Sequence, residues 1–508
     1  MPARPPIPDP VPDPGPPSAF RTERDSLGEV AVPSAAYWGA QTARAVANFP
    51  VSGLGPHPAF VRAMVQIKRA AALANMETGR LPRDVGLAIV RAAEEALAQI
   101  PPVPLAGAPG PALPGAPRLA DQWVVDPYQA GAGTSHNMNT NEVLANRAAE
   151  LLGGRRGEYR RVHPNDHVNM AQSTNDTVPT AIRLIGLDLG TRLVRTLARC
   201  ANAFQDRAVA FDGILKTGRT HLQDAVPIRL GQEFAAYART VERGARRIAQ
   251  SLEPLREIGL GGTAVGTGLN AEPAYITAAA RHLGAATGHA LRPAADMRQA
   301  MQSMGDVAGL SGACRALALD LGKIASDLRL LASGPRTGLG EIVLPAVQPG
   351  SSIMPGKVNP VLCEMLNMVC LQALGHDHTI AAASEAGQLE LNVMMPVIAH
   401  NLAWMLTILE GGVAAFTARC VRGIEADPER CRYWLERSAA LSTALAPRIG
   451  YDAAAALTKD MLRTGRGIAE LALERGLLER DDLEAILEPE AMTSPGVPGG
   501  RGEGRPGG

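Results

Sequence analysis

Aromatic residues are scarce in this chain of 508 residues, at only 4%. Alanine, leucine and glycine abound instead, which is typical of long helices that pack closely together. The chain also lacks a net charge, with 50 Lys plus Arg against 50 Asp plus Glu. This balance favours neither nucleic acid nor an anionic membrane as a partner, so any anion-binding site must be a local feature.

Cysteine is rare as well, and its spacing excludes two kinds of site. The six cysteines, none of them in a C-x-x-C pair, are Cys200, Cys314, Cys363, Cys370, Cys420 and Cys431. This pattern argues against a zinc site or a disulfide scaffold and predicts a reducing, cytoplasmic location. The N-terminus lacks the apolar core of a signal peptide, and no uninterrupted apolar run reaches the length needed to cross a bilayer. We therefore expect a soluble protein without membrane partners.

Proline and glycine mark the parts of the chain that cannot form a core. Residues 1–18 and about 495–508 are Pro/Gly-rich tails, which we expect to be disordered. A Pro/Ala/Gly insert at 101–117 is expected to be a mobile surface excursion. Elsewhere the apolar residues recur at helical spacing, and the predicted helices are 58–74, 82–100, 179–212, 306–333, 361–383 and 391–424. Several are apolar on more than one face, which predicts burial between subunits.

The segment QPGSSIMPGKVNP at 348–360 is the densest in chemically useful side chains. It carries two hydroxyls, an ammonium and a carboxamide within nine residues, on Ser351, Ser352, Lys357 and Asn359. Its glycines allow backbone conformations closed to other residues, and its prolines prevent a continuous helix. We interpret it as an ordered loop that can open and that brings donors to an anion. The alternative is a polar surface loop.

Three other segments share this character. Thr134 and Ser135 follow a glycine-rich turn, with a helix expected to start near Asn141, and a helix N-terminus after hydroxyl residues suits an anion as well as a simple cap. The second segment, Ser173-Thr174-Asn175, precedes the helix predicted from Pro179. The third, Thr220-His221, falls at a glycine-marked turn between two long helices. Together these donors suit a small dianion held by many directional hydrogen bonds.

Two further motifs do not support a cofactor or a metal. His163 and His167 have the i, i+4 spacing of a metal pair, but Pro164 interrupts the helix that such a pair needs and no companion ligands follow. Residues 259–264 read G-x-G-x-x-A, a loose dinucleotide fingerprint. This motif should follow a buried strand, whereas here we expect it to follow a helix ending near Ile258. We therefore expect neither a metal site nor NAD binding.

At this point the sequence resembles the aspartase/fumarase superfamily, whose members cleave a C–N or C–O bond of a succinyl compound and release fumarate. GSSIMPGKVNP (350–360) is similar to the signature loop of that superfamily. Thr134, the run 173–176 and Thr220-His221 match its other shared regions in the same order. The resemblance covers residues 20–496, apart from the insert.

Two branches of the superfamily compete, aspartate ammonia-lyase (aspartase) and class II fumarase. Residues 125–146, 341–352, 384–398 and 492–496 are most similar to aspartase, whereas 36–42 and 163–166 are similar to fumarase, the latter to a secondary dicarboxylate site. Because the segments beside the primary site resemble aspartase, the resemblance favours that branch. A lyase acting on an N-substituted aspartate is a further alternative. A structural protein of the lens-crystallin kind is another, although the key site residues are all present.

The resemblance also implies roles, an architecture and an assembly. Ser351 would be the catalytic base; Thr134, Ser173, Thr174 and Ser352 would hold the β-carboxylate; Lys357, Asn359 and Thr220 would hold the α-carboxylate; Asn175 and His221 would face the amino group, with Glu364 orienting His221. The implied fold is all-α, with domains at 19–172, 173–426 (a bundle of long helices) and 427–494. A homotetramer with sites shared between subunits is implied, without an organic cofactor, although a divalent cation assists some aspartases.

Overall fold

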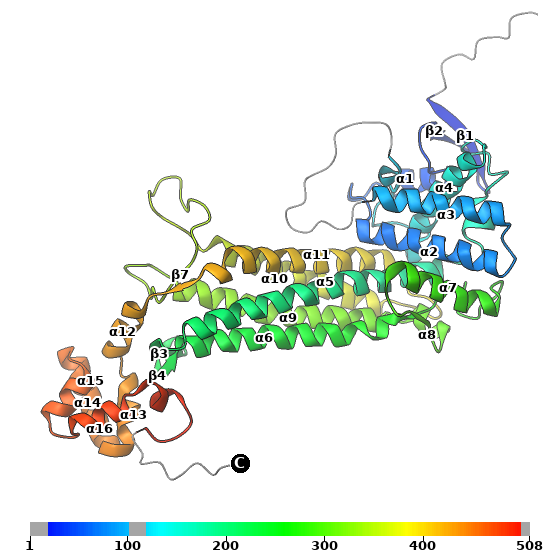
Figure 1. The fold of residues 1–508 in the computed structure, drawn as a ribbon. Coiled ribbons are helices and arrows are strands. Elements are labelled where there is room, and N and C mark those ends of the chain that lie inside the picture. The colour runs from blue at the N-terminus through cyan, green and yellow to red at the C-terminus, as the bar shows by residue number, and fades with distance from the viewer. Residues whose placement is uncertain (1–18, 101–117, 499–508) are drawn as a thin grey trace, which may run out of the picture. The chain divides into compact units, whose positions relative to one another are not determined.

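The computed structural model describes residues 19–100 and 118–498, and these residues are mostly helical (Figure 1). In this part of the chain the strands form four small sheets of two strands each, which confirms the all-α prediction. The predicted insert at 101–117 and nearly all of the two predicted tails lie outside the described residues.

The helices and strands follow one another along the chain with short connections. The N-terminal elements are β1 (Phe20–Asp25), β2 (Gly28–Pro33), α1 (Ala40–Asn48), α2 (Pro58–Glu77), α3 (Arg83–Gln99) and α4 (Thr134–Leu151). The central elements are α5 (Thr174–Ala210), β3 (Leu215–Thr220), β4 (Gln223–Arg229), α6 (Leu230–Leu252), β5 (Glu257–Ile258), α7 (Pro273–Thr287), β6 (Arg292–Pro293), α8 (Met297–Gln302), α9 (Gly305–Leu331), β7 (Ile342–Val343), α10 (Val361–Glu385) and α11 (Met395–Arg419). The C-terminal elements are β8 (Glu425–Ala426), α12 (Pro428–Arg437), α13 (Ala440–Ile449), α14 (Tyr451–Thr464), α15 (Ile468–Glu474), α16 (Arg480–Ile486) and α17 (Pro489–Thr493).

These bounds confirm most of the predicted helices and correct others. α2, α3, α9, α10 and α11 lie within a few residues of their predicted ranges. α4 was expected near Asn141 but begins at Thr134, because its buried face is polar and gives no apolar period. α5 begins at Thr174, before the predicted start, and includes Pro179. The predicted helix ending near Ile258 is also wrong, since α6 ends at Leu252 and a two-residue strand follows.

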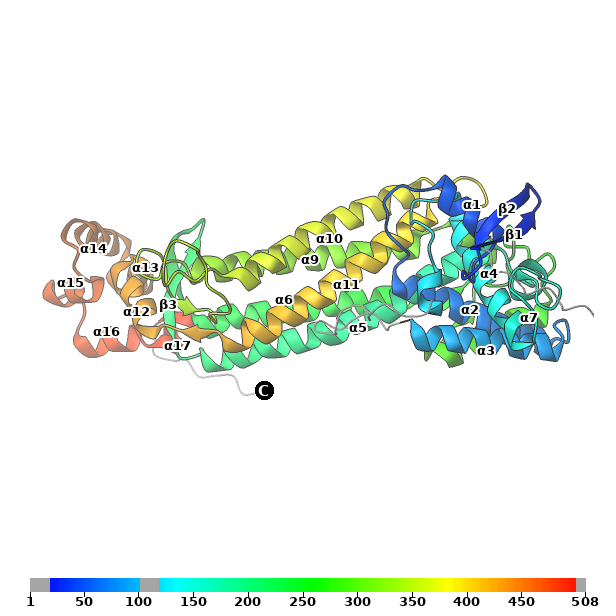
Figure 2. The same ribbon diagram turned by 90° about the horizontal axis from the view of Figure 1, so that it is seen from above.

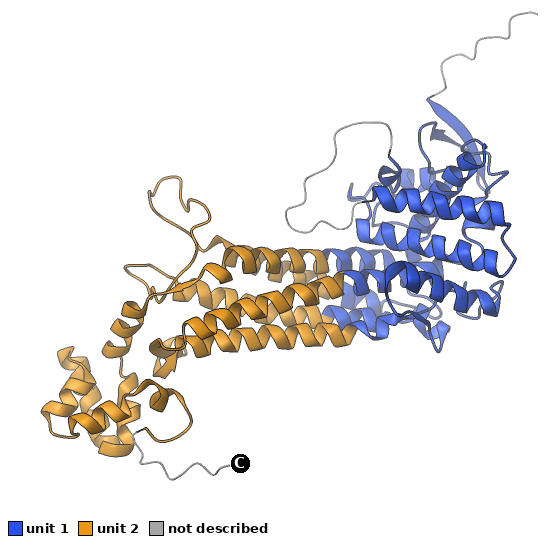
Figure 3. Cartoon of the chain, in the orientation of Figure 1, with its two compact units in different colours: residues 1–188, 252–311, 378–404 blue, residues 189–251, 312–377, 405–508 orange. Residues whose placement is uncertain are grey.

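The chain divides into two compact units (Figure 3). Unit 1 comprises residues 1–188, 252–311 and 378–404, and unit 2 comprises 189–251, 312–377 and 405–508. The division passes through four helices, α5, α9, α10 and α11, which each contribute residues to both units. This is a different partition from the three domains expected at 19–172, 173–426 and 427–494, which remain a prediction.

Unit 1 has its core between α2, α3 and α4. Val65 on α2, Ile89 on α3 and Leu144 on α4 are fully buried in one hydrophobic cluster. Trp123 closes the cluster near α4 and donates its indole N–H to Thr140 Oγ1 at 3.0 Å. Burial of large apolar side chains on three helices is the main stabilising contribution here, at about 1.5–3 kcal/mol for each one.

Unit 2 combines parts of the long helices, which run side by side in both ribbon views (Figure 2), with a cluster of short C-terminal helices. Phe204 on α5, Phe234 and Tyr237 on α6, and Phe416 on α11 form an aromatic cluster with ring centroids 5.7–6.2 Å apart. The few aromatic residues of the chain are therefore concentrated where long helices meet. The helices α12 to α16 enclose a second apolar core that includes Leu445 and Leu457.

One helix corrects the expectation that no apolar run is long enough to cross a membrane. In the described part of the chain, Met395–Gly423 has the length and composition of a membrane span. However, 61% of its most apolar window is buried inside the protein. A mostly buried helix of this composition is typical of a protein core, which agrees with the contacts of Phe416.

Candidate active site

The first group of candidate residues lies at the N-terminal end of α5, in unit 1. Thr174 is the first residue of the helix, and Ser173 and Asn175 lie on either side of it. Ser173 Oγ accepts from the amide of Asn175 at 3.2 Å, and Asn175 Nδ2 donates to the carbonyl of Ala264 at 2.8 Å. Helix N-termini present unpaired amides and a positive dipole end, so this turn is suited to an anion.

The buried carboxylate of Asp176 holds this turn in place. It accepts from the amide of Ser173 at 2.9 Å and from the amides of Gly261 and Thr263 at 3.0 Å each. Burial raises the pKa of Asp176 to about 6 although these amides and nearby Lys68 oppose the shift. The residues 259–264 that resembled a dinucleotide fingerprint therefore wrap a carboxylate of the protein itself.

Behind the same turn lies a fully buried lysine. Lys68 Nζ donates to Asn169 Oδ1 at 2.9 Å and to Gln172 Oε1 at 3.0 Å, and burial lowers its pKa to about 7. Asn137 Nδ2 lies 3.2 Å from Asn169 Oδ1 and 3.2 Å from Thr174 Oγ1. A continuous polar network thus connects the buried ammonium to Thr174. Sequence reasoning missed Lys68 because a lysine within the apolar period of α2 looks like an exposed residue.

Thr134 opens α4, also in unit 1. The preceding Gly133 has a φ of +90°, a conformation that favours glycine, and it lets the chain turn directly into the helix. Thr134 is exposed, whereas the next residues of the helix, including Asn137, are buried. Both hydroxyl-rich segments of unit 1 are therefore first turns of long helices.

The second group of candidate residues lies in unit 2, around the loop 350–360. The neck of the loop is closed by two hydrogen bonds, from Gly350 N to the carbonyl of Lys357 and from Asn359 Nδ2 to the carbonyl of Gly350, both 2.8 Å. Beyond the neck, Ser352 to Val358 are exposed. The amide of Asn359, expected to bind substrate, here holds the loop together.

Ser351 occupies the first turn of this loop and is partly buried. Its Oγ accepts from the amide of Ile353 at 3.2 Å and from the amide of Met354 at 3.1 Å. Two amide dipoles aimed at one oxygen stabilise negative charge on that oxygen. Ser351 is thus the candidate hydroxyl whose surroundings suit an anionic form.

Thr220 and His221 lie at the tip of a β-hairpin, not at a simple turn between helices. β3 and β4 pair antiparallel, with Thr220 opposite Gln223, so that His221 and Leu222 form the turn. Both turn residues have positive φ, 56° for His221 and 59° for Leu222. Both are exposed, which leaves the His221 imidazole available to a ligand. Gly218, expected to mark the turn, instead lies at a register shift within β3.

The single chain does not bring all candidate residues together. Thr134 and 173–175 belong to unit 1, whereas Thr220, His221 and the loop 350–360 belong to unit 2 (Figure 3). Glu364 also belongs to unit 2, in the first turn of α10. Among the residues that the structure describes, no hydrogen bond joins it to His221. The expected pairing of these two residues therefore remains a prediction.

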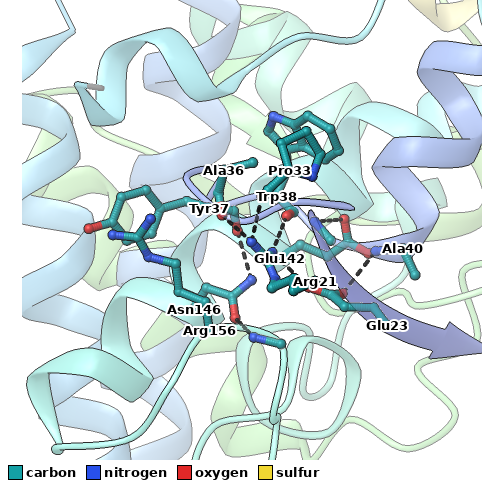
Figure 4. A network of polar contacts seen from close by, with 12 residues as sticks. Arg21, Glu23, Pro33, Ala36, Tyr37, Trp38, Ala40, Glu142, Asn146 and Arg156 are labelled. Atoms are coloured by element: carbon teal, nitrogen blue, oxygen red, sulfur yellow. Dashed lines mark hydrogen bonds and ion pairs between the residues drawn. The ribbon is translucent and has the colours of Figure 1, made fainter. Parts of the chain in front are cut away.

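The segments that resembled fumarase have local structural roles. Residues 36–42 fold around the buried carboxylate of Glu142, which accepts from the amide of Gly39 at 2.8 Å and from Thr42 Oγ1 at 2.6 Å (Figure 4). Asn146 Nδ2 donates to the carbonyl of Tyr37 in the same network. His163 Nδ1 accepts from the amide of Asp166 at 3.1 Å and so begins a short helix from Pro164.

Metal ligands were not expected, and the geometry of the histidines fits that expectation without testing it. Within 19–100 and 118–498, no three His, Cys, Asp or Glu residues are grouped so that they could hold a metal ion. In the pair suggested by spacing, His167 Nδ1 accepts from the amide of His163 at 2.9 Å. That nitrogen is therefore already used by the backbone.

A largely helical protein whose hydroxyl, amide and ammonium donors gather at helix starts and on one loop is suited to a small anionic substrate, and the comparisons place it among the lyases. A family model described as "Lyase" matches residues 116–375, and one described as "Fumarase C C-terminus" matches residues 441–494. The chain belongs to the aspartase/fumarase superfamily.

Individual relatives agree with this assignment and span both branches. The chain is 47% identical to an aspartate ammonia-lyase of Bacillus subtilis, over 94% of this chain and 97% of that protein. It is 48% identical to a class II fumarate hydratase of Halobacterium salinarum, over 94% and 98%. A solved structure of a fumarate lyase:delta crystallin from Brucella melitensis bound to cobalt is 46% identical, with a TM-score of 0.87, covering 94% of this chain and all of that one.

Proposed function

We propose that the protein is an aspartate ammonia-lyase, which converts L-aspartate into fumarate and ammonia by anti-elimination. The observation that carries the proposal is the loop 350–360, where two amides point at Ser351 Oγ. Several relatives at 46–48% identity over most of the chain are aspartate ammonia-lyases, which supports the C–N branch. Class II fumarase is the second candidate, favoured by the 48% identity to the Halobacterium enzyme.

In this reaction Ser351 acts as the base. The Cβ proton of aspartate is only weakly acidic, so its removal leaves an aci-carboxylate that carries two negative oxygens. The deprotonated hydroxyl takes this proton, and the electron pair then forms the double bond as the C–N bond breaks. The amides of Ile353 and Met354 favour the anionic hydroxyl because they donate to the same oxygen.

The remaining candidates hold the two carboxylates and the amino group. We assign Thr134, Ser173, Thr174 and Ser352 to the β-carboxylate, where the charge increases during the reaction. Lys357, Asn359 and Thr220 are assigned to the α-carboxylate, and Asn175 and His221 to the leaving amino group, with Glu364 orienting His221. Many donors arranged before the reaction lower the barrier most where charge develops.

This assignment requires several subunits, and we propose a homotetramer with shared sites. The candidates fall into two groups in two different units of the chain. Large apolar side chains also stay exposed on the long helices of unit 2, where Leu319 is 58%, Met368 66% and Leu371 68% exposed. Large exposed apolar patches of this kind usually mark a subunit interface.

The proposal places the enzyme in the cytoplasm and gives it no organic cofactor. All six cysteines are buried free thiols, which suits a reducing compartment. The serine base and the hydrogen-bond donors supply the acid–base and electrostatic chemistry that the elimination needs. Addition of Mg²⁺ to the assay described next tests activation by a divalent cation.

An ultraviolet assay for fumarate, with L-aspartate and L-malate supplied in parallel, tests the proposal. The purified protein should form fumarate from aspartate and not appreciably from malate. Faster turnover of malate would move the chain to the fumarase branch. Fumarate formation only from an N-substituted aspartate would keep the C–N lyase chemistry and change the substrate. Light scattering on the same sample should show a tetramer, and an active monomer would contradict shared sites.

A further inference from the structure

A buried ion cluster joins the hairpin β3–β4 to the segment that leads into the loop 350–360. The carboxylate of Glu341 is fully buried, with Lys216 Nζ 3.2 Å from Oε2 and Arg219 Nη1 2.9 Å from Oε1. Both cations lie on β3, whose last residue is Thr220. Buried charges are rare and are costly unless paired, and apolar side chains would usually stabilise a core as well. Such a cluster therefore suggests a role other than stability.

The main chain of Glu341 is fixed on both sides. Its amide donates to the carbonyl of Leu331 at the end of α9, and its carbonyl accepts from the amide of Asp427, both at 2.9 Å. The next two residues form β7, which pairs with β8. From there the chain continues to Gly350, where the loop begins. Glu341 is therefore an anchored point from which its side chain reaches the hairpin and its backbone leads to the loop.

The hairpin has a reason to need such an anchor. His221 and Leu222 both adopt positive φ although neither is glycine or asparagine. This conformation is unfavourable for residues with large side chains, and it persists only where the surrounding structure imposes it. Arg219 lies two residues before His221 and is held by Glu341 Oε1. The ion cluster thus restrains the strand directly before the strained turn.

We propose that Glu341 is a positioning residue, which keeps Thr220 and His221 in their turn and fixes the start of the loop that carries Ser351. The inference rests on the proposed function, because it assumes that these three residues contact substrate. Through Lys216 and Arg219, one carboxylate sets the placement of two separate segments. Misplacement of catalytic groups by about 1 Å can cost about 10²-fold in rate.

A matched pair of variants separates positioning from general stabilisation. Glu341→Gln removes the charge that holds both cations but keeps the size of the side chain. Glu233→Gln makes the same change at a second partner of Lys216, which lies 3.2 Å from that ammonium but on α6. Glu233 forms no ion pair with Arg219 among the described residues. A merely electrostatic contribution to stability predicts similar results for the two variants, whereas positioning predicts different ones.

Steady-state kinetics with the full-length enzyme give the first readout. Glu341→Gln should lower kcat by about 10²-fold with a much smaller change in KM, because misaligned groups mainly affect the transition state. Glu233→Gln should keep nearly normal kcat. Glu341→Asp, which retains the charge, should recover part of the loss. Equal losses in the two Gln variants, or an unchanged kcat in Glu341→Gln, would overturn the proposal.

Hydrogen exchange gives a second readout that does not depend on activity. In Glu341→Gln, exchange should become faster at 215–229 and 342–360 while the amides of α5 and α11 stay protected. Faster exchange throughout the chain would indicate a structural role and overturn the proposal. If Glu341→Gln does not assemble, Arg219→Lys, which keeps the charge, should show the same local pattern more weakly. An inactive wild-type enzyme would refute the proposed function, while exchange would still decide whether Glu341 restrains both segments.

Discussion

The two groups of candidate residues are held in very different ways. At the start of α5, in unit 1, the backbone is held by the buried carboxylate of Asp176, and Thr174 connects through Asn137 and Asn169 to the buried Lys68. The loop 350–360, in unit 2, is closed only at its neck, and Ser352 to Val358 are exposed. One group therefore belongs to the framework, and the other projects from it.

This difference agrees with the chemistry that each group would perform. A carboxylate that is present before and after the reaction is best bound by donors that are already in place, which lowers the cost of ordering them. A base that must meet a carbon-bound proton benefits from a segment that closes after the substrate has entered. The comparison predicts that changes in the loop affect turnover, whereas changes at the start of α5 affect stability as well.

The largest effect is expected for Ser351→Ala. General-base catalysis contributes about 10²–10⁴-fold, so kcat should fall at least that much while aspartate binding and the melting temperature change little. Ser352→Ala is the matched control, and its effect should be milder because several other donors share the β-carboxylate. Kinetics and thermal unfolding of both variants give the answer. If Ser351→Ala kept nearly normal kcat, the base would have to be sought elsewhere, with His221 the first candidate.

Two glycines of the loop sharpen the comparison further. An alanine Cβ at Gly350 would lie 2.6 Å from the carbonyl oxygen of Lys357 and 2.8 Å from Asn359 N, so Gly350→Ala must open the neck. A displacement of Ser351 by about 1 Å should then lower kcat/KM by about 10²-fold. Gly356 has a φ of +81° but open space around its Cβ position, so Gly356→Ala should cost only about 1–2 kcal/mol of backbone strain. Similar kcat/KM values for the two variants would show that the neck is unimportant.

Unit 1 should lose stability as the pH falls below about 6.5. Burial lowers the pKa of His57 and His136 to about 4; for His57 the charge of His400 adds to the shift, and for His136 the Val125 carbonyl and Asp126 oppose it. Since both folded-state values lie below the ordinary 6.5, the stabilising contribution is complete above pH 6.5 and is lost toward pH 4. The loss should reach about 2 kcal/mol for each histidine at pH 5.

Urea unfolding at pH 7 and pH 5 measures this loss. His136→Gln, which cannot take up a proton, should reduce the difference in unfolding free energy between the two pH values. An exposed histidine in the same unit, His282, provides a control in His282→Gln, which should leave the difference unchanged. A slope that His136→Gln does not alter would mean that other groups cause it.

A smaller effect is expected for Asp176→Asn. The asparagine amide would place an NH₂ group against at least one of the three amides that Asp176 now accepts from. An unsatisfied buried donor costs about 1–3 kcal/mol, so the free energy of unfolding should fall by that amount. Asp166→Asn, whose side chain is 76% exposed, is the control and should be nearly neutral. If Asp176→Asn changed only kcat, the start of α5 would not belong to the framework.

The sequence predicted the fold well where the buried surface is apolar. α2, α3, α9 and α10 were found from their period, because their buried faces consist of apolar side chains. α4 begins earlier than predicted because its buried face includes Asn137, Asn139 and Asn141, which hide the period. The hairpin β3–β4 was missed because its turn residues are His221 and Leu222, which do not belong to the usual turn residues.

The candidate site could be predicted only as a set of segments. The donors of the loop 350–360 are close together in sequence, so their residue types were sufficient to identify them. Lys68, Asp176 and Glu341 were missed, because single charged residues inside apolar segments look like exposed residues until their burial is known. Their partners lie far away in sequence, and no local pattern records such pairs. The roles of the individual site residues remain predictions for the kinetic tests above.

Four helices belong partly to unit 1 and partly to unit 2, and this has a consequence for how the protein can change. Each unit is composed of three separate stretches of chain, and every boundary between them falls within or next to a helix. No single cut therefore releases either unit as a continuous fragment. A gene fusion or exchange that transplants one half of the chain would carry over an incomplete core. New substrate preferences in such a protein are more easily acquired by substitutions in its loops than by recombination of its parts.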